Sequence, residues 1–238
     1  MPTTLVIIPA YNEEQRIAAV IAGVRAAVSG AAIVVVDDGS HDGTAAAATA
    51  AGAMVLRHPF NMGYGVAIQT GYKYALAQGC DWLVQIDGDG QHDPASIPTL
   101  LAPLQDGTAD FVLGSRFLSG ESYRPPLLRR LGMSFFRKIV SVVIRQPVSD
   151  CTSGFQAFNR DVINFFAGDL FPCDYPDADV LISLHLAGFR IREVPVRMSA
   201  SATGKSMHSG IKPVYYVFKM LLSICVTLLR SHRLYRRR

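Results

Sequence analysis

The chain alternates between short, nearly continuous apolar runs and longer segments in which apolar residues recur every three or four positions. Runs of the first kind are typical of strands buried on both faces, and the second pattern is typical of helices that pack one side on a core. The predicted strands are 5–9, 32–36, 54–57, 82–86 and 110–113, and the predicted helices between them are 13–24, 41–51, 66–78 and 95–104. Asn12 is the predicted N-cap of the first helix. This order predicts a doubly wound, mostly parallel α/β sheet with helices on both faces.

The second half of the chain has a different pattern. Residues 127–145 mix basic and apolar positions as an amphipathic helix does, 149–159 is irregular or extended, 178–187 is helical, and 190–198 alternates like a strand. The last predicted helix, 212–230, sets basic residues against a wide apolar face and leads into terminal arginines. We therefore divide the chain into a main domain over 1–210 and an amphipathic helix with a basic tail over 211–238.

The C-terminal helix allows three topologies. A membrane-spanning helix needs roughly 20 apolar residues, whereas the apolar run over 213–229 is shorter and carries Lys219 in its middle. A helix lying on an anionic membrane surface, with its basic residues at the headgroups, fits this pattern better. The two alternatives are a last helix that packs on the core, with a solvated basic tail, and a single membrane span.

Composition and charge indicate which kinds of partner and which cellular compartment suit the protein. Of the 238 residues, 50% are hydrophobic and the net charge is +4, so a sizeable core and an acidic partner are expected. The four cysteines are scattered without a CxxC pair, which favours reduced thiols over disulfides or zinc. The N-terminal residues lack the basic start of a signal peptide. We expect a peripheral protein on the cytoplasmic face of a membrane, with no nucleic-acid partner.

Polar and acidic residues follow three of the predicted strands, in PAYNEE (9–14), VVVDDGS (34–40) and QIDGDGQ (85–91). The carboxyl ends of parallel strands share one edge of a sheet, where ligands of α/β proteins bind. Gly88 and Gly90 allow the backbone to bend until Asp87 and Asp89 address one point. Such oxygen ligands suit Mg²⁺ or Mn²⁺, and the Gln91 amide oxygen adds a third. The alternative is an acidic turn that caps the helix after it.

The same three loops match what a nucleotide-sugar needs: a carboxylate for the NH of a base, contacts for the ribose, and a metal for the diphosphate. The first turn lacks GxGxxG, which argues against a dinucleotide oxidoreductase, and it lacks GxxxxGKS, which argues against a P-loop.

Six segments, in order, carry a resemblance to a known family: PAYNEE, VVDDGS, NMGYG with AIQTGY, DGDGQHDP, GSRF and DCTSGFQAF. Together they resemble the family 2 inverting glycosyltransferases with the GT-A fold, and within that family the synthases of dolichyl- or polyprenyl-phosphate mannose or glucose. The resemblance covers residues 5 to 210. It implies a hexosyltransferase with Mg²⁺ or Mn²⁺ as cofactor, a GDP- or UDP-sugar donor and a polyprenyl (dolichyl or undecaprenyl) phosphate acceptor. The alternative is a family 2 glycosyltransferase that acts on a saccharide hydroxyl in cell-envelope glycan synthesis.

The resemblance also implies roles for individual residues. The nucleoside pocket would be lined by Pro9, Tyr11, Glu13 and Asp38. Asp87, Asp89 and Gln91 would hold the metal, with Asp87 also binding the donor. The acceptor phosphate would meet Arg116, Arg130 and Ser134. The alternatives are an N-cap role for Asp38 and a solvated basic face for the arginines. Asp150 is expected to order the loop behind the sugar pocket.

One departure from the family pattern concerns the acceptor. The lipid-phosphate synthases tend to show Arg-x-x-Gly-x-Ser near the end of the fold, but the chain has Ser201 in place of the arginine. Lys205 is the candidate substitute, although an ammonium is a less directional phosphate partner than a guanidinium.

The expected reaction is an in-line displacement that inverts the anomeric carbon, with Asp87, Asp89 and Arg116 as the catalytic set that supports the leaving diphosphate. A phosphate acceptor is already a dianion at neutral pH and needs no base. A saccharide hydroxyl needs one, and Asp174, Asp177 and Asp179 are the candidates, with helix capping as their alternative role. A third hypothesis is an inactive, membrane-associated nucleotide-binding module.

Overall fold

The computed structural model describes residues 3–118, 127–169, 171–174, 176–199 and 212–234, without the side chains at 127–131, 212–216 and 230–234. Within these residues one sheet has the order β3-β2-β1-β4-β6-β5-β7. Its strands are β1 (Thr4–Ala10), β2 (Ala32–Asp37), β3 (Met54–Arg57), β4 (Trp82–Gln85), β5 (Phe111–Ser115), β6 (Gln156–Asn159) and β7 (Ile191–Pro195). Only β6 runs antiparallel to its neighbours, so the predicted mostly parallel sheet is confirmed.

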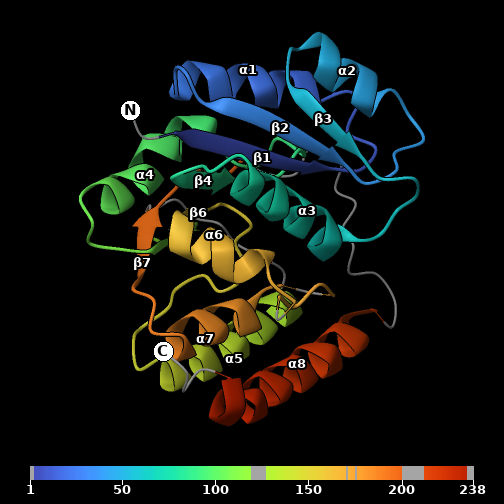
Figure 1. Cartoon of the computed structure of the whole chain (residues 1–238). Coiled ribbons are helices and arrows are strands. Elements are labelled where there is room, and N and C mark those ends of the chain that lie inside the picture. Colours follow the sequence, from blue (N-terminus) through green and yellow to red (C-terminus); the bar gives the residue numbers. More distant parts are fainter. Residues whose placement is uncertain (1–2, 119–126, 170, 175, 200–211, 235–238) are drawn as a thin grey trace.

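Helices cover both faces of this sheet (Figure 1). One face carries α1 (Ile17–Ala27), α2 (Thr44–Ala50) and α4 (Ile97–Gln105), the last preceded by the short 3₁₀ helix η1 (Pro94–Ser96). The other face carries α3 (Tyr64–Ala77) and α6 (Arg160–Ala167). Beyond these lie α5 (Leu127–Val143), α7 (Ala178–Leu186) and α8 (Lys212–Leu234), with α5 and α8 both packed on α7.

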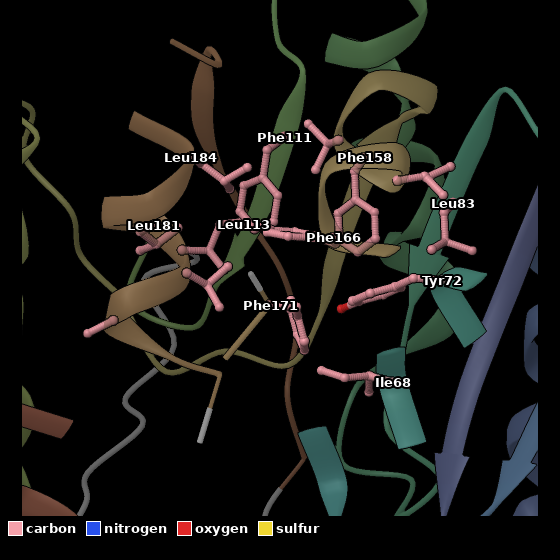
Figure 2. Close-up of a cluster of buried hydrophobic side chains, with 14 of the residues drawn as sticks. Ile68, Tyr72, Leu83, Phe111, Leu113, Phe158, Phe166, Phe171, Leu181 and Leu184 are labelled. Atoms are coloured by element: carbon pink, nitrogen blue, oxygen red, sulfur yellow. The ribbon is translucent and has the colours of Figure 1, made fainter. Parts of the chain in front are cut away.

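Side chains that alternate along the central strands supply two separate cores. On β1, Leu5 and Ile7 belong to the cluster under α3 and α6, while Val6 and Ile8 belong to the cluster under α1 and α4. Because both faces are covered, the positions of β1 after Thr4 are all apolar and the sequence shows a continuous run. Figure 2 shows the aromatic centre of the first cluster, in which Phe111 and Phe158 stack with ring centroids 5.5 Å apart.

The antiparallel strand β6 lies between β4 and β5, where the sequence indicated only an irregular or extended segment. Gln85 pairs with Gln156 and Leu113 pairs with the same residue, so β6 bridges the strands that precede the DGDGQ and GSRF segments. Helix α6, which follows β6 directly, was not predicted. The Asn159 side chain caps it by accepting a hydrogen bond from the Val162 N–H at 3.1 Å.

Several predicted boundaries need correction. Helix α2 begins at Thr44, three residues later than predicted. Helix α1 starts at Ile17, and Asn12 is not its N-cap: Asn12 has a φ of 57° and its side chain accepts a hydrogen bond from the His41 N–H at 2.9 Å. Asn12 therefore joins two loops of the sheet edge. Helix α3 begins two residues earlier than predicted, at Tyr64, and β7 is shorter than the predicted 190–198.

Helix α8 has one packed side and one exposed side. Met220 and Ile224 are buried in the core shared with α7, and Lys219 forms an ion pair of 2.6 Å with Asp174. The exposed residues Phe218, Leu222, Cys225 and Leu229 recur at helical spacing along the other side. Helix α8 thus shows the predicted core contact and also an apolar stripe that no described residue covers. Among the described residues, no helix is long and apolar enough to cross a membrane.

Candidate active site

The loops after β1, β2 and β4 are joined at one edge of the sheet. The Asp38 N–H donates to the Ala10 carbonyl oxygen at 2.9 Å, and the Asn12 N–H donates to the Ser40 hydroxyl at 2.9 Å. On the other side of β1, the Gly88 N–H donates to the Pro9 carbonyl oxygen at 3.2 Å. The three polar segments singled out in the sequence are therefore neighbours in space.

Asp87 follows β4 and is held by groups from three parts of the chain. The Tyr64 hydroxyl donates to Asp87 Oδ1 at 2.9 Å, and His92 Nε2 lies 3.5 Å from Asp87 Oδ2. A Cβ at Gly154 would lie 2.6 Å from the same Oδ2, so only glycine fits there. Loss of water around the carboxylate raises its pKa, but His92, Tyr64 and Arg116 outweigh this and hold the pKa of Asp87 below its usual value. Asp87 is therefore an anion at neutral pH.

Asp89 lies in the turn that Gly90 makes with a φ of 72°. Its two oxygens accept hydrogen bonds from the Gln91 N–H at 2.9 Å and from Gln91 Nε2 at 2.6 Å. Burial and the charge of Asp87 raise the pKa of Asp89. Two carboxylates that repel each other at the end of a strand fit a divalent cation, whose charge would relieve the repulsion. In this conformation the side-chain amide nitrogen of Gln91 donates to Asp89, so the Gln91 amide oxygen does not contact that carboxylate. The role of this oxygen as a metal ligand stays a prediction.

The predicted nucleoside side is built on β1 and β2. Pro9 is buried in β1, whereas Tyr11 is 41% exposed and meets the His41 ring edge-on with centroids 6.4 Å apart. Glu13 pairs with Arg16 at 2.5 Å. Burial raises the pKa of Glu13, and the charge of Asp89 adds to this, so the acidic groups of the two loops act on one another.

Asp38 is nearly buried and holds the loop that leads into α3. Its carboxylate accepts hydrogen bonds from the N–H groups of Met62 and Gly63 at 2.9 and 2.8 Å, and His58 Nδ1 lies 2.7 Å from Oδ1. The alternative role as an N-cap of α2 is not seen, because α2 starts after Gly43 without a side-chain cap. Its contact with a base stays a prediction.

Arg116 is 5% exposed and forms a two-pronged pair with Asp150. Its Nε and Nη2 donate to the two carboxylate oxygens, each at 2.6 Å, and Nη2 also reaches the Thr152 hydroxyl at 2.9 Å. The loop that carries Asp150 is in turn fixed by Glu193 of β7, which accepts from the Asp150 N–H at 3.0 Å. Asp150 thus has the ordering role expected of it. Arg116 acts on the site through its charge, which lowers the pKa of Asp87.

The other predicted acceptor residues are only partly covered by the described residues. Arg130 lies in α5, but its side chain lies outside the described residues, as does Lys205 entirely. Ser134 is a half-buried residue of the same helix. Their roles stay predictions.

The three candidate bases lie in different surroundings. Asp174 is exposed and paired with Lys219 of α8. Asp179 is fully buried and accepts hydrogen bonds from the Ser223 hydroxyl and the Val180 N–H, so it takes the capping role that was its alternative. Asp177 precedes α7, is half-buried, and makes no side-chain cap. Burial of the Tyr64 hydroxyl raises the pKa of Tyr64 well above its usual value, and the negative charges of Asp87 and Asp177 raise it further. Asp177 is therefore a candidate base whose charge acts on a residue that contacts Asp87.

Comparison with known proteins agrees with this geometry. The model of Glycosyl transferase family 2 matches residues 5–166, which include all three joined loops. The chain belongs to glycosyltransferase family 2. It is 32% identical over 228 residues to the polyprenol monophosphomannose synthase of Mycolicibacterium smegmatis, covering 91% of this chain and 85% of the relative. It is 31% identical over 214 residues to the undecaprenyl-phosphate mannosyltransferase of Micrococcus luteus, covering 87% of each.

A comparison with solved structures identifies the fold of this glycosyltransferase. The glucosyl-3-phosphoglycerate synthase of Mycobacterium tuberculosis, solved with Mn²⁺, uridine diphosphate and phosphoglyceric acid, superposes with a TM-score of 0.66 at 24% identity. The match covers 97% of this chain and 78% of that protein. This likeness, together with the mixed seven-stranded sheet, confirms the predicted GT-A fold.

Several residues of the glycosyltransferase site were missed in the sequence. Tyr64 and His58 contact Asp87 and Asp38, and Glu193 fixes the loop of Asp150. Gln85 was the one detectable signal, since a polar residue inside the apolar run of a buried strand must find hydrogen-bond partners. The others lie at the start of a helix (Tyr64), in a loop (His58) and in an edge strand (Glu193), and their partners are 20 or more positions away in the sequence.

Proposed function

We propose that this enzyme transfers a hexose from a GDP- or UDP-sugar to a polyprenyl phosphate, with inversion at the anomeric carbon. The observation that carries the proposal is the acidic pair Asp87 and Asp89 at the sheet edge, joined to the loops of Tyr11 and Asp38. The two relatives named above support the acceptor, because both names specify a polyprenyl phosphate or its mannose product.

In this mechanism the acceptor oxygen forms a bond to the anomeric carbon while the bond to the diphosphate oxygen breaks. Asp87 and Asp89 would hold Mg²⁺ or Mn²⁺, and such a cation supplies positive charge that stabilises the departing diphosphate. Asp87 is suited to this because it stays ionised. Arg116, kept rigid by Asp150, adds a fixed positive charge behind Asp87. A phosphomonoester acceptor is a dianion near pH 7, so no side chain has to remove a proton.

The acceptor chain implies a membrane, and two helices offer surfaces for it. On α8 the exposed stripe is Phe218, Leu222, Cys225 and Leu229. On α5, the exposed residues Phe135, Lys138 and Val142 share one side at helical spacing, and the exposed Arg145 follows just beyond the end of the helix. Apolar side chains that enter the headgroup region beside basic ones are the pattern of an interfacial helix on an anionic leaflet. We therefore propose peripheral binding to the membrane face that holds the donor.

A second candidate function is transfer to a saccharide hydroxyl. The position of Asp177 favours it, because this half-buried carboxylate acts on Tyr64 beside Asp87 and makes no helix cap. A hydroxyl acceptor must lose its proton in the transition state, and Asp177 is the group that would accept it.

One experiment separates these functions. Purified protein with Mn²⁺ is incubated with GDP- and UDP-hexoses and with either a polyprenyl phosphate or an oligosaccharide acceptor, and products are followed by mass spectrometry. A lipid-linked product that is lost on chelation and in Asp89→Ala, but kept in Asp177→Asn, supports the first proposal. An oligosaccharide product that disappears in Asp177→Asn supports the second. No turnover with any donor, while the nucleotide still binds, contradicts both and identifies an inactive binding module.

A further inference from the structure

Gln85 is a polar side chain at the end of β4, 1% exposed and surrounded by apolar core. All of its amide groups are used. Oε1 accepts a hydrogen bond from the Tyr72 hydroxyl, and Nε2 donates to the Gly154 carbonyl oxygen and to the Tyr64 oxygen, each at 3.0 Å. A buried amide with this many partners fixes the position of each of them.

The partners also fix the direction of the hydrogen bonds. If the Gln85 amide were flipped, its oxygen would face the Gly154 carbonyl oxygen, and two acceptors repel each other. With the nitrogen there, the Tyr64 oxygen accepts from Gln85, so the single hydroxyl hydrogen of Tyr64 is left to bond Asp87 Oδ1 at 2.9 Å. In the series Tyr72, Gln85, Tyr64 and Asp87, each residue therefore donates a hydrogen bond to the next, from the core toward Asp87.

The series of hydrogen bonds begins at Tyr72, whose ring is packed in the aromatic cluster. The Tyr72 ring lies among Phe158, Phe166 and Phe171 (Figure 2). Its centroid is 5.3 to 5.6 Å from the centroids of these three rings. Close-packed rings of this kind have little freedom to shift. The chain of hydrogen bonds thus connects a rigid core with the carboxylate at the sheet edge.

Asp87 is confined on its other side as well. The space beside Oδ2 is bounded by Gly154, where a Cβ would lie 2.6 Å away, and by His92 Nε2 at 3.5 Å. The hydrogen bond from Tyr64 is therefore the contact that sets the rotation of the carboxylate within this space.

We propose that Tyr64 is a positioning residue for Asp87, with Gln85 and Tyr72 setting the direction of its hydrogen bond. The inference rests on the proposed function, since it concerns the cation that Asp87 would hold. Groups that orient a metal ligand from behind typically contribute about 10- to 100-fold to metal affinity. This gives the tyrosine of the NMGYG segment a role that its sequence resemblance alone does not supply.

The test is Tyr64→Phe, which removes only the hydroxyl. Mn²⁺ binding is measured by electron paramagnetic resonance titration in the presence of UDP or GDP, without acceptor and without turnover. We expect Mn²⁺ to bind about tenfold or more weakly, with the unfolding temperature unchanged. The matched control is Tyr74→Phe on the same helix, whose hydroxyl contacts Met54 Sδ at 2.8 Å, and it should bind Mn²⁺ like the wild type.

A second variant tests the direction of the hydrogen bonds that lead to Asp87. Gln85→Met keeps the side-chain length but removes the donor to Tyr64, and its effect on Mn²⁺ affinity should vanish in the Tyr64→Phe background. If that variant does not fold, Tyr72→Phe provides the same comparison. Wild-type Mn²⁺ affinity in Tyr64→Phe overturns the inference alone. A wild-type protein that binds no Mn²⁺ with either nucleotide overturns the metal-dependent function, and the inference with it.

Discussion

At the scale of single residues, Gly154 is a close constraint on Asp87. A methyl group there would lie 2.6 Å from Asp87 Oδ2 and 2.8 Å from the Tyr64 oxygen. We expect Gly154→Ala to displace Asp87 and to lower turnover by about 100-fold, as a small misplacement of a reacting group can do. Steady-state assays of the lipid-linked product measure this loss.

Gly132→Ala is the control for that substitution. Gly132 lies within α5, and apart from the helix backbone no described atom lies within 4 Å of a Cβ added there, so Gly132→Ala should keep activity and slightly stabilise the helix. Equal activity of the Gly154→Ala variant and the wild type would mean that the Asp87 position does not limit catalysis.

Single residues also show what the sequence can and cannot predict about this site. Asp87 and Asp89 were found because their spacing and the glycines between them carry chemistry within a few positions. The partner of Arg116 was not found, since Asp150 lies 34 positions away and only the return of the chain through β6 brings them together. Tyr64 and Asp87 are 23 positions apart and meet for the same kind of reason.

At the scale of elements, Asp179 links α7 and α8 in a way that depends on pH. Burial raises the pKa of Asp179 to about 6, the charge of Asp177 adds to this, and the Ser223 hydrogen bond opposes it. A raised pKa means that folding favours the protonated form. The stabilising contribution is therefore complete below about pH 4 and is lost as the pH rises through about 6, to a total of about 3 kcal/mol.

Asp179→Asn cannot ionise and should escape this loss. Its free energy of unfolding should exceed that of the wild type at pH 7.5, and the difference should shrink toward pH 4.5, as measured by urea denaturation at both values. Asp174→Asn, an exposed aspartate that pairs with the same helix α8, serves as the control and should lack this trend. A pH-independent difference for Asp179→Asn would refute the assignment.

The strands of the first half were easier to predict from the sequence than the positions at which the helices begin. The five parallel strands of the first half follow from apolar runs that helices cover on both sides. Strand β6 is short and has Gln156 facing polar partners, so it carries no such run. The predicted start of α1 was too early because asparagine is a common N-cap residue. In the structure the Asn12 side chain instead accepts a hydrogen bond from His41 and so joins two loops.

At the scale of the whole molecule, the exposed stripe of α8 is the surface through which the proposed membrane contact is tested. Burial of a leucine side chain is worth about 1.5 to 3 kcal/mol, so replacing Leu222 and Leu229 by serine should weaken binding to vesicles that contain anionic lipid by at least about tenfold. Sedimentation with such vesicles measures the change. The matched pair Met54→Ser and Leu76→Ser removes exposed apolar groups from β3 and α3 and should leave binding unchanged. Equal binding by both double variants would exclude α8 as the contact.

The reversed direction of β6 has a consequence for how such enzymes diversify. The strands β1, β2 and β4, which carry the loops proposed to bind the nucleotide, are contiguous in the sheet, and β6 separates them from β5. The segment between β5 and β6 therefore leaves and re-enters the sheet as one insert, anchored by Arg116 at one end and Asp150 at the other. We therefore expect that replacing this insert, α5 included, changes the proposed acceptor contacts and leaves the proposed donor loops in place.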